Sequence, residues 1–579
     1  MPRKHGVRPV EASSRACHVR FNRLSVLYNI CFTLKLVLTP LFAYLTEPFP
    51  WAIPPPFDPA WNATNEADFS AATATYLQSI YNNRTLSPST VCHRDVATNS
   101  HAIRMRRLLP PSETDCIKYL VHLPAAGQYG AGMRRLVCTF LAQSDRAHVP
   151  WYHCEHVHML GLPTGDACVW FEQSSVSHEP DEFMVYHAFL IWENPVLSWC
   201  KLAFRCALAA YILRVVWRRY YTHYTVLVNN LTAHPIRDDR SIDSVEVVMG
   251  DPTYLVLSNP FVLLVMIVDM WLGISYVAIA AARASQYEDW MSFALGCVYN
   301  ARFVWAGYMM MWMLSRAAKR RGLEGSFAPV DPAHLGVLAY LYAGPIVLLL
   351  ARTTMMVMYH RLWDLLVPTS ALESHIETLP GCVLLSMTMA VVPVVASTTW
   401  GLWHHHRRIF CAAARREKSF KCLRDYCPRR YNDLKSRLVL TLALRNVTYD
   451  VRFVGGALYK LIARRPCIRR MPLFSHRGAD CCIVAYRADS TVALELRLVL
   501  LGCLDLRPPN SIAHSVRCRP SGAASPFGVL STSPCTLCQK RSSDPNVWLR
   551  LHPGANKCKW VLYPNEDAND KVSLYPSKK

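Results

Sequence analysis

YLVLSNPFVLLVMIVDMWLGISYVAIAAA, residues 254–282, is a long apolar stretch that carries a single acid, Asp269. A helix rises about 1.5 Å per residue, so about twenty residues cross a hydrocarbon core about 30 Å thick. Stretches of similar length and composition occur at 24–45, 196–217, 291–314, 335–359 and 381–403. The sequence therefore predicts an α-helical multi-pass membrane protein with about six transmembrane helices.

The composition agrees with a membrane protein. Of 579 residues, 52% are hydrophobic and only 18% are charged, which is a low share of charge for a soluble chain. The formal net charge of +22 would suit nucleic acid, but the basic residues gather beside the apolar stretches. Basic clusters next to a membrane attract anionic lipid. We therefore expect the lipid bilayer as a partner, with anionic lipid at the basic tail, and no nucleic acid.

The distribution of Lys and Arg predicts the orientation. Basic residues crowd before the first stretch and after the second, fourth and sixth stretches, whereas the short loops between them hold little charge. Loops rich in Lys and Arg stay in the cytoplasm. Both ends of the chain are therefore expected inside the cell. The first stretch has no clear small-residue cleavage site and is interpreted as an uncleaved anchor.

The second stretch is the weakest of the six. It contains Lys201, Arg205 and Arg214, and a central Arg costs about 2.5–3.5 kcal/mol on insertion scales. Without this crossing, however, the later basic loops would face outward. Six spans, and not five, therefore keep all the basic loops on the cytoplasmic side. The expected organisation is a basic cytoplasmic N-terminus, a first helix, an extracellular Cys-containing loop domain, transmembrane helices two to six, and a basic cytoplasmic tail, at 1–23, 24–45, 46–185, 196–403 and 404–579.

The long outer loop has the features of a small folded domain. It carries glycosylation sequons at Asn62 and Asn83. Its five cysteines suggest two disulfides and one remaining thiol, with the pairing open among Cys92, Cys116, Cys138, Cys154 and Cys168. The apolar runs CIKYLVHL (116–123) and RRLVCTFLA (134–142) suggest strands. We expect a small α+β or β-rich domain here, and a mixed core in the cytoplasmic tail.

Charged residues inside the spans are the main candidates for function, because such groups are costly in lipid. Asp269 and Arg302 lie near the middle of two spans joined by a short loop, so an ion pair between them is expected. Lys35 lies at a similar depth and Arg352 lies somewhat shallower. These residues form either a polar path for an ion or anionic solute, or an interhelical pair that fixes assembly.

Proline and small residues indicate how the spans are shaped and packed. Pro260, Pro345 and Pro393 fall within spans, where a proline kinks a helix and frees a backbone carbonyl. Ser292 and Gly296 have the small-xxx-small spacing that lets helices approach closely. Packing is the simpler interpretation of this spacing.

Two groups of residues invite a metal interpretation. HCEHVH (153–158) collects candidate ligands in the outer loop, and three histidines stand at 404–406, on the opposite side of the membrane. In the tail, two cysteines have the spacing of a zinc knuckle, and two later residues could complete four ligands: Cys535, Cys538, His552 and Cys558. A second knuckle is missing, so ordinary reduced cysteines remain the alternative.

Motifs of known catalytic chemistry are missing from the sequence. It has no GxxxxGK[ST] phosphate loop, no HExxH, no GxSxG and no Gly-rich dinucleotide turn. We therefore expect neither an enzyme nor a cofactor. The first interpretation is a receptor-like or interaction protein with an extracellular ligand, in the plasma membrane. The alternative is a solute transporter or ion-conducting protein that uses Asp269 and Arg302.

Two segments carry a resemblance. VEVVMGDPTYLVLSNPFVLLVMIVDMWLGISYVA (245–278) and FAPVDPAHLGVLAYLYAGP (327–345) are similar to a group of multi-pass membrane proteins from water moulds (oomycetes) that has no known activity. The similarity covers about residues 190–410. It implies a membrane protein with a large outer loop, and it implies no activity and no functional residue.

Overall fold

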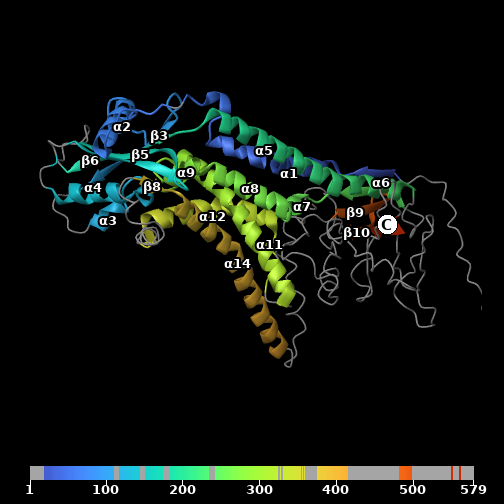
Figure 1. Cartoon of the computed structure of the whole chain (residues 1–579). Helices are drawn as coiled ribbons and strands as arrows, with labels where there is room; N and C mark the ends of the chain where they lie inside the picture. Colours follow the sequence, from blue (N-terminus) through green and yellow to red (C-terminus); the bar gives the residue numbers. More distant parts are fainter. Residues whose placement is uncertain are drawn as a thin grey trace, which may run out of the picture.

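Two main β-sheets, one larger and one smaller, lie at opposite ends of the molecule, and long apolar helices run between them (Figure 1). The described residues also include a short antiparallel pair, β11 (Arg550–Leu551) and β12 (Trp560–Val561). The computed structural model describes residues 18–55, 57–109, 116–143, 146, 150–173, 181–233, 242–321, 323, 327, 330–353, 355, 356, 358, 375–414, 481–498, 550, 551, 560 and 561. Most of the tail predicted at 404–579, including the candidate metal ligands Cys535, Cys538, His552 and Cys558, lies outside these residues.

The larger sheet has six strands in the order β2-β3-β6-β5-β4-β8. Five pair antiparallel: β2 (Cys92–Asp95), β3 (Ser100–Leu108), β4 (Trp151–Met159), β5 (Leu162–Gln173) and β6 (Glu182–Ile191). The first four lie within the outer loop predicted at 46–185, whereas β6 begins there and continues beyond its expected end. The sixth, β8 (His375–Glu377), comes from the loop between the last two long helices and pairs parallel with β4. The fifth and sixth predicted spans are therefore joined at the sheet end.

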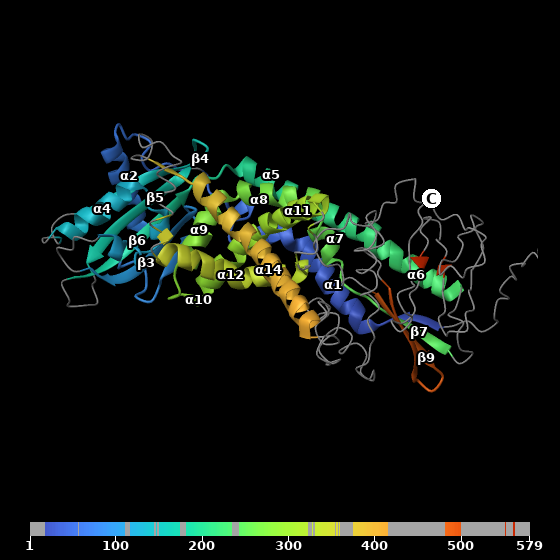
Figure 2. The ribbon, with the colours of Figure 1, turned by 90° about the horizontal axis from the view of Figure 1, so that it is seen from below.

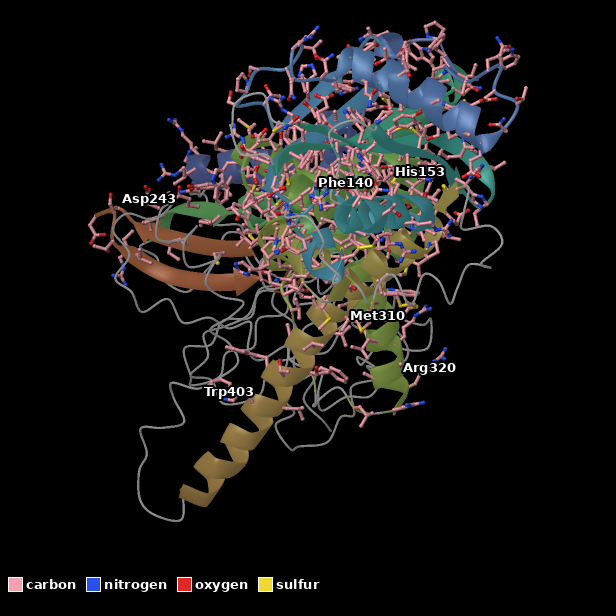
Figure 3. All side chains as sticks on the ribbon, turned by 90° about the vertical axis from the view of Figure 1, so that its left-hand side faces the viewer. Phe140, His153, Asp243, Met310, Arg320 and Trp403 are labelled. Carbon is pink, nitrogen blue, oxygen red and sulfur yellow. A yellow bond between two sulfur atoms is a disulfide. The ribbon has the colours of Figure 1, made fainter. Side chains whose placement is uncertain are left out.

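Helices cover both faces of this sheet. Helix α2 (Glu66–Ile80) packs on one face, while α3 (Cys116–Leu120) and α4 (Ala131–Ala142) cover the other. The expectation of strands in these last two segments is wrong. In α4 the buried residues are Met133, Val137, Phe140 and Leu141, which have helical spacing and form one apolar face. Phe140 lies among packed side chains at this end of the molecule (Figure 3).

The cysteines of this domain form two disulfides. Cys116 of α3 is bonded to Cys138 of α4, and Cys154 of β4 is bonded to Cys168 of β5 across the sheet. Cys92 is a free thiol. The first bond links the two helices on one face, and the second links two neighbouring strands.

The long helices follow the apolar stretches of the sequence. They are α1 (Arg23–Leu38) with the 3-10 turns η1 (Thr39–Leu45) and η2 (Pro50–Ala52), α5 (Pro195–Val216) continuing through the π-helical η4 (Trp217–Tyr221) into α6 (Thr222–Ala233), α7 (Thr253–Leu257), α8 (Pro260–Leu272), α9 (Ile274–Ala284), α10 (Trp290–Asn300), η5 (Ala301–Phe303), α11 (Val304–Arg321), α12 (Pro332–Arg352) and α14 (Leu379–Ala414). Helices α11 and α14 lie together and run obliquely to α1 and α5 (Figures 1 and 2).

By length and composition, four helical segments can cross a membrane: Arg23–Ala52, Pro195–Tyr221, Pro332–Arg352 and Leu379–Trp403. Helices α8 and α9 count as a fifth only when taken together, and they meet at an angle of 79°. The stretch predicted at 291–314 is divided among α10, η5 and α11 and is not among these segments. The described residues therefore do not form six uninterrupted spans.

Backbone chemistry explains where the helices start and bend. Pro260 is the first residue of α8, and the Asn259 side chain accepts a hydrogen bond from the Phe261 amide at 3.0 Å. The expectation that Pro260 lies inside a span is therefore wrong, whereas Pro345 and Pro393 do lie within α12 and α14. The small residues pack as their spacing suggests, since a Cβ on Gly296 would be 2.7 Å from the Ala280 carbonyl of α9.

The smaller sheet has four strands in the order β1-β7-β9-β10. They are β1 (His18–Phe21), β7 (Ile242–Val248), β9 (Cys481–Arg487) and β10 (Val492–Leu498). The sheet thus joins the segment before α1, the segment between α6 and α7 and a segment of the tail. These three regions lie at the same end of the molecule (Figure 2).

Candidate functional site

Six buried charged side chains meet where α5 and α8 pass η5 and the segment after η1. Three are acids and three are bases, so the group has a formal charge of zero. Each side chain belongs to a residue that is at most 7% exposed. We call this group the charge network; its members are Glu47, Glu193, Lys201, Arg205, Asp269 and Arg302.

Arg205 of α5 is the centre of the network. Its two terminal nitrogens donate to the two carboxylate oxygens of Glu47 at 2.7 and 2.9 Å, and its Nε donates to Asp269 at 2.6 Å. The guanidinium also lies 4.7 Å from the centre of the Tyr44 ring. A planar guanidinium suits such paired recognition of carboxylates. Arg205 therefore ties α5 to α8 and to the chain after η1.

Arg302 of η5 is the second arginine that pairs with Asp269 and Glu47. It bonds Asp269 through one terminal nitrogen and lies 3.4 Å from Glu47 through the other. The structure thus brings Asp269 and Arg302 together, but as two members of a larger group. Lys201 bonds Glu193 and lies 3.7 Å from Glu47.

Two tyrosines bind the carboxylates of the network. Tyr299 of α10 donates to Glu47 at 2.6 Å, and Tyr276 of α9 donates to Glu193. Tyr299 also lies 3.2 Å from the carbonyl oxygen of Gly273, the residue between α8 and α9. The bend between these helices is therefore linked to the network through Tyr299.

The pairing explains how the second span tolerates its cations. Desolvating an ion is costly, and neighbouring opposite charges with further hydrogen bonds offset that cost. Sequence reasoning treated Lys201 and Arg205 as obstacles to insertion and missed Glu47 and Glu193. Glu47 directly precedes Pro48, and Glu193 lies two residues before Pro195. Both acids thus lie at the edge of a span, and this position is the signal that could have found them.

The other two cations that the sequence predicts inside spans lie outside the network. Lys35 is exposed near the end of α1, with its Nζ 5.6 Å from the Tyr340 ring centre. Arg352, at the end of α12, donates to the carbonyls of Ser285 and Val121 at 2.8 and 3.3 Å. Grouping Arg352 with Asp269 and Arg302 is therefore wrong, because Arg352 binds the backbone of the sheet domain and of the residue that follows α9.

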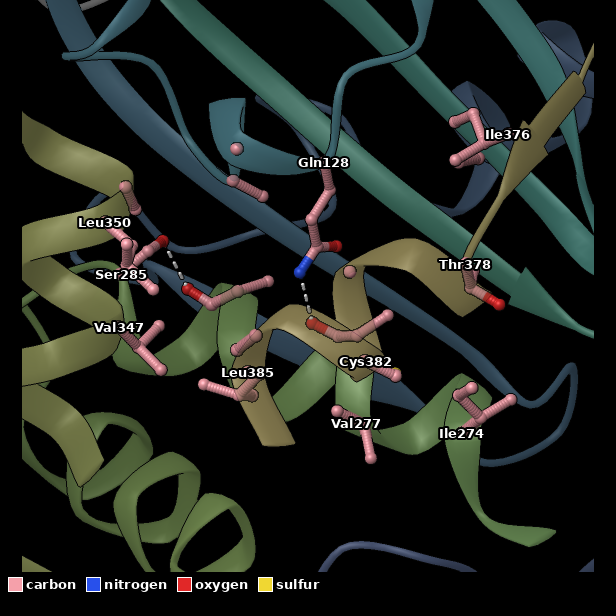
Figure 4. A pocket seen from close by; sticks show the side chains of 18 of the residues that line it. Gln128, Ile274, Val277, Ser285, Val347, Leu350, Ile376, Thr378, Cys382 and Leu385 are labelled. Atoms are coloured by element: carbon pink, nitrogen blue, oxygen red, sulfur yellow. Dashed lines mark hydrogen bonds between the residues drawn. The ribbon is translucent and has the colours of Figure 1, made fainter. Parts of the chain in front are cut away.

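An apolar cavity lies between the six-stranded sheet and the helices (Figure 4). We call it the junction cavity, and its empty volume is about 950 Å³. Its walls include Val157 and Phe189 of the sheet, Val277 and Ala281 of α9, Leu350 of α12 and Leu385 of α14. Gln128 reaches across one side and donates to the Ala278 carbonyl at 2.7 Å. A cavity with this mainly apolar lining suits an apolar ligand.

The outer histidines are arranged by strand alternation. No group of three potential ligands for a metal occurs among the described residues, and Cys154 is used in a disulfide. His153 and Glu155 lie on the α4 face, where Glu155 accepts a hydrogen bond from the Met133 amide at 2.9 Å. This contact places the carboxylate at the positive end of the helix. The same contact holds the run 153–158 against α4. His153 lies at the same end of the molecule as Phe140 (Figure 3).

On the opposite face, His156 Nδ1 lies 2.8 Å from Asp166. Burial raises the pKa of the Asp166 carboxyl, and the hydrogen bond with His156 opposes that rise. The histidines at 404–406 lie in α14.

The two predicted glycosylation sites differ in environment. Asn62 is exposed. Asn83 is half-buried, and its side chain accepts a hydrogen bond from Tyr186 at 2.8 Å and donates one to the Gln173 carbonyl at 3.3 Å. Asn62 is therefore the more accessible acceptor.

Comparison of the chain with models of protein families, with curated proteins and with solved structures finds no match.

Proposed function

We propose that the chain is a receptor-like protein of the plasma membrane that crosses the bilayer six times and binds an apolar ligand in the junction cavity. In this proposal α8–α9 and α10–η5–α11 are two broken crossings, and the six-stranded sheet is extracellular. Two kinds of strand pairing support the topology. Strand β8, which precedes the last span, joins the outer-loop sheet. Strand β1 before the first span, β7 between the second and third spans, and β9 after the sixth span belong to one four-stranded sheet.

The junction cavity is the observation that carries the proposed function. Its walls come from a disulfide-bonded sheet domain and from three helices of the membrane part. A ligand here would contact the sheet domain and the helices at the same time. Binding energy could then favour one arrangement of these parts over another, which is the requirement for a receptor.

Helix α9 provides the connection from the cavity to the rest of the membrane part. It contributes Val277 and Ala281 to the cavity wall, and its first residue follows Gly273. Tyr276 of the same helix binds Glu193 of the charge network. A displacement of α9 by a ligand would therefore act on the network and on α8.

Photolabelling with a diazirine analogue of palmitate tests the cavity. The full-length protein is labelled in membranes, and the labelled peptides are mapped by mass spectrometry. Ala281→Phe fills space in the cavity, and we expect it to reduce labelling of α9 and of the start of α14 about ten-fold. Leu341→Phe is the matched control, because Leu341 is 67% exposed on α12 and does not line the cavity.

Labelling of α9 that is equal in wild type, Ala281→Phe and Leu341→Phe would overturn the proposal. A thermal unfolding measurement on each purified variant shows whether the larger side chain has damaged the fold.

A solute transporter is the second candidate. Its support is that both broken crossings bend beside the charge network, at Gly273 and at η5, and transporters place substrate sites at such breaks. The pairing of all six charges with one another favours a structural network instead. Robust solute flux through the purified protein in liposomes would favour the transporter over the receptor.

A further inference from the structure

A second cavity lies among α1, α7, α11 and α12 and is separate from the junction cavity. Its empty volume is about 1090 Å³. Unlike the junction cavity, it has cationic side chains in its wall. These are Lys35 of α1 and Arg302 of η5. His334 of α12, whose Nδ1 lies 3.3 Å from Asp331, lines the cavity beside them. We call it the cationic cleft.

Lys35 shows that the cleft is open to the surroundings of the helices. It lines the cleft and yet is exposed. It lies twelve residues beyond Arg23, about 18 Å along α1, so it is far from the basic end of that helix. A lysine exposed at such depth in a bilayer is costly unless an anion or water meets it. The Tyr340 ring, 5.6 Å away, stabilises the cation only in part.

Arg302 offers the second donor. The residue is 7% exposed, and its terminal nitrogens contact Asp269 and Glu47. Its Nε, in contrast, is buried and has no hydrogen-bond partner among the residues that the structure describes. Such a donor costs free energy unless something accepts its proton. An oxygen atom of a ligand in the cleft would satisfy it.

The remaining wall is mainly apolar. Phe32 and Leu36 of α1, Val337 of α12 and Trp305 of α11 line the cleft beside the cations. Cationic groups beside an apolar wall fit a molecule with an anionic head and a hydrocarbon chain. Because Lys and Arg side chains bind phosphate well, the head group that fits is a phosphate.

We propose that the cationic cleft binds the phosphate group of an anionic phospholipid, with Lys35 and Arg302 on the phosphate and an acyl chain along the apolar wall. The phospholipid would come from the surrounding membrane, because the cleft is open at Lys35, which is exposed on α1, a candidate membrane-spanning helix. This proposal does not depend on ligand binding in the junction cavity.

Native mass spectrometry of the full-length protein in detergent tests the proposal. The purified protein is incubated with phosphatidylglycerol, or with phosphatidylcholine that has the same acyl chains. We expect phosphatidylglycerol to be retained preferentially, and Lys35→Gln to reduce its retention about five-fold, which corresponds to about 1 kcal/mol for one cation near a lipid head group. Lys35 is exposed, so its substitution leaves the core intact.

Lys118→Gln is the matched control. Lys118 is also exposed and also lies over a tyrosine ring, that of Tyr119 at 5.5 Å, but it belongs to α3 in the sheet domain. This variant should retain phosphatidylglycerol as wild type does. Equal retention of both lipids by wild type would overturn the proposal, and so would unchanged retention in Lys35→Gln.

Inorganic phosphate distinguishes a lipid from a soluble ligand. If millimolar phosphate displaces phosphatidylglycerol completely, the cleft recognises the phosphate without the chain, and the lipid proposal is wrong. Retention that persists in phosphate supports it. His334→Gln gives a second variant, and a further loss of phosphatidylglycerol in the double variant with Lys35→Gln would place the head group between α1 and α12.

Discussion

Arg205 illustrates how a residue that opposes membrane insertion in isolation is stabilised by its partners. It is fully buried, and three of its nitrogens donate to Glu47 and Asp269. Removing one partner of such a group leaves an uncompensated charge and costs about 3–5 kcal/mol. The six charges therefore stabilise one another as a group. Swapping the two residues of one ion pair would not preserve these interactions.

Exchanging Asp269 and Arg302 tests this mutual stabilisation. In a simple ion pair, Asp269→Arg combined with Arg302→Asp would restore the attraction. Here we expect no rescue, because the new arginine would face Arg205 and the new aspartate would face Glu47. The double variant should lose about 3–5 kcal/mol of unfolding free energy. The measurement is thermal unfolding of the detergent-solubilised protein.

A matched exchange provides the control. Arg107 and Glu288 form a partly exposed pair at 2.9 Å, and exchanging them should cost about 1 kcal/mol or less. If the variant with Asp269 and Arg302 exchanged is as stable as this control variant, the six charges do not stabilise one another as a group.

His187 gives the sheet domain a pH dependence. It is fully buried in β6 and stacks on the Tyr129 ring at 5.2 Å. Burial lowers the pKa of His187 to about 3, against a usual value of about 6.5. Between these values the unfolded chain binds a proton that the folded domain does not, so stability falls as pH falls below about 6.5.

We expect about 1.4 kcal/mol of stability to be lost per pH unit over this window for one such histidine. His187→Phe should make the fall shallower, but should not abolish it, because burial also lowers the pKa of His101. Unfolding midpoints between pH 7.5 and 5 measure the effect, with the exposed His93→Phe as control. An identical slope in wild type and His187→Phe would contradict the prediction.

At the scale of elements, the break between α8 and α9 matters most for the candidate site. A continuous helix would carry Tyr276 and the alanines of α9 away from the sheet. The 79° bend instead lets α9 line the junction cavity while α8 holds Asp269 in the network. Gly273 lies at the bend because its neighbours leave no room for a side chain.

Gly273→Ala tests that constraint. The added Cβ would lie 2.6 Å from a Glu47 oxygen and 2.7 Å from the Tyr299 hydroxyl. We expect overpacking to cost about 1–3 kcal/mol in thermal unfolding. At Gly127 a Cβ would be 3.9 Å from Ala351, so Gly127→Ala should be close to neutral. Equal stability of the two variants would show that Gly273 is not constrained by the network.

The elements also show which features the sequence could predict. Apolar length located the long helices, and the short loop between two spans brought Asp269 near Arg302. Hydropathy does not report backbone direction, so the break at Gly273 could not be predicted. The segment at 134–142 was mistaken for a strand because its short apolar run was considered without its helical spacing of buried residues. Strand β8 has only three residues, too few to give a pattern.

At the scale of the whole molecule, each sheet is assembled from segments that are far apart in the chain. The four-stranded sheet pairs β1 with β7 across α1 and α5, and pairs β7 with β9 across all later helices. Two crossings separate the first pair, and four separate the second when α8–α9 and α10–α11 each count as one. Even numbers return the chain to the same side, so the pairing is compatible with the proposed topology.

Epitope insertions at two exposed hairpins test the topology directly. One follows Val96, which is 54% exposed between β2 and β3, and the other follows Asp489, between β9 and β10. Both lie in turns, where insertions are tolerated best. An antibody applied to intact cells should detect the first epitope and should detect the second only after permeabilisation. Detection of the second epitope on intact cells would place both sheets on one side, and this would require an even number of crossings between β6 and β9.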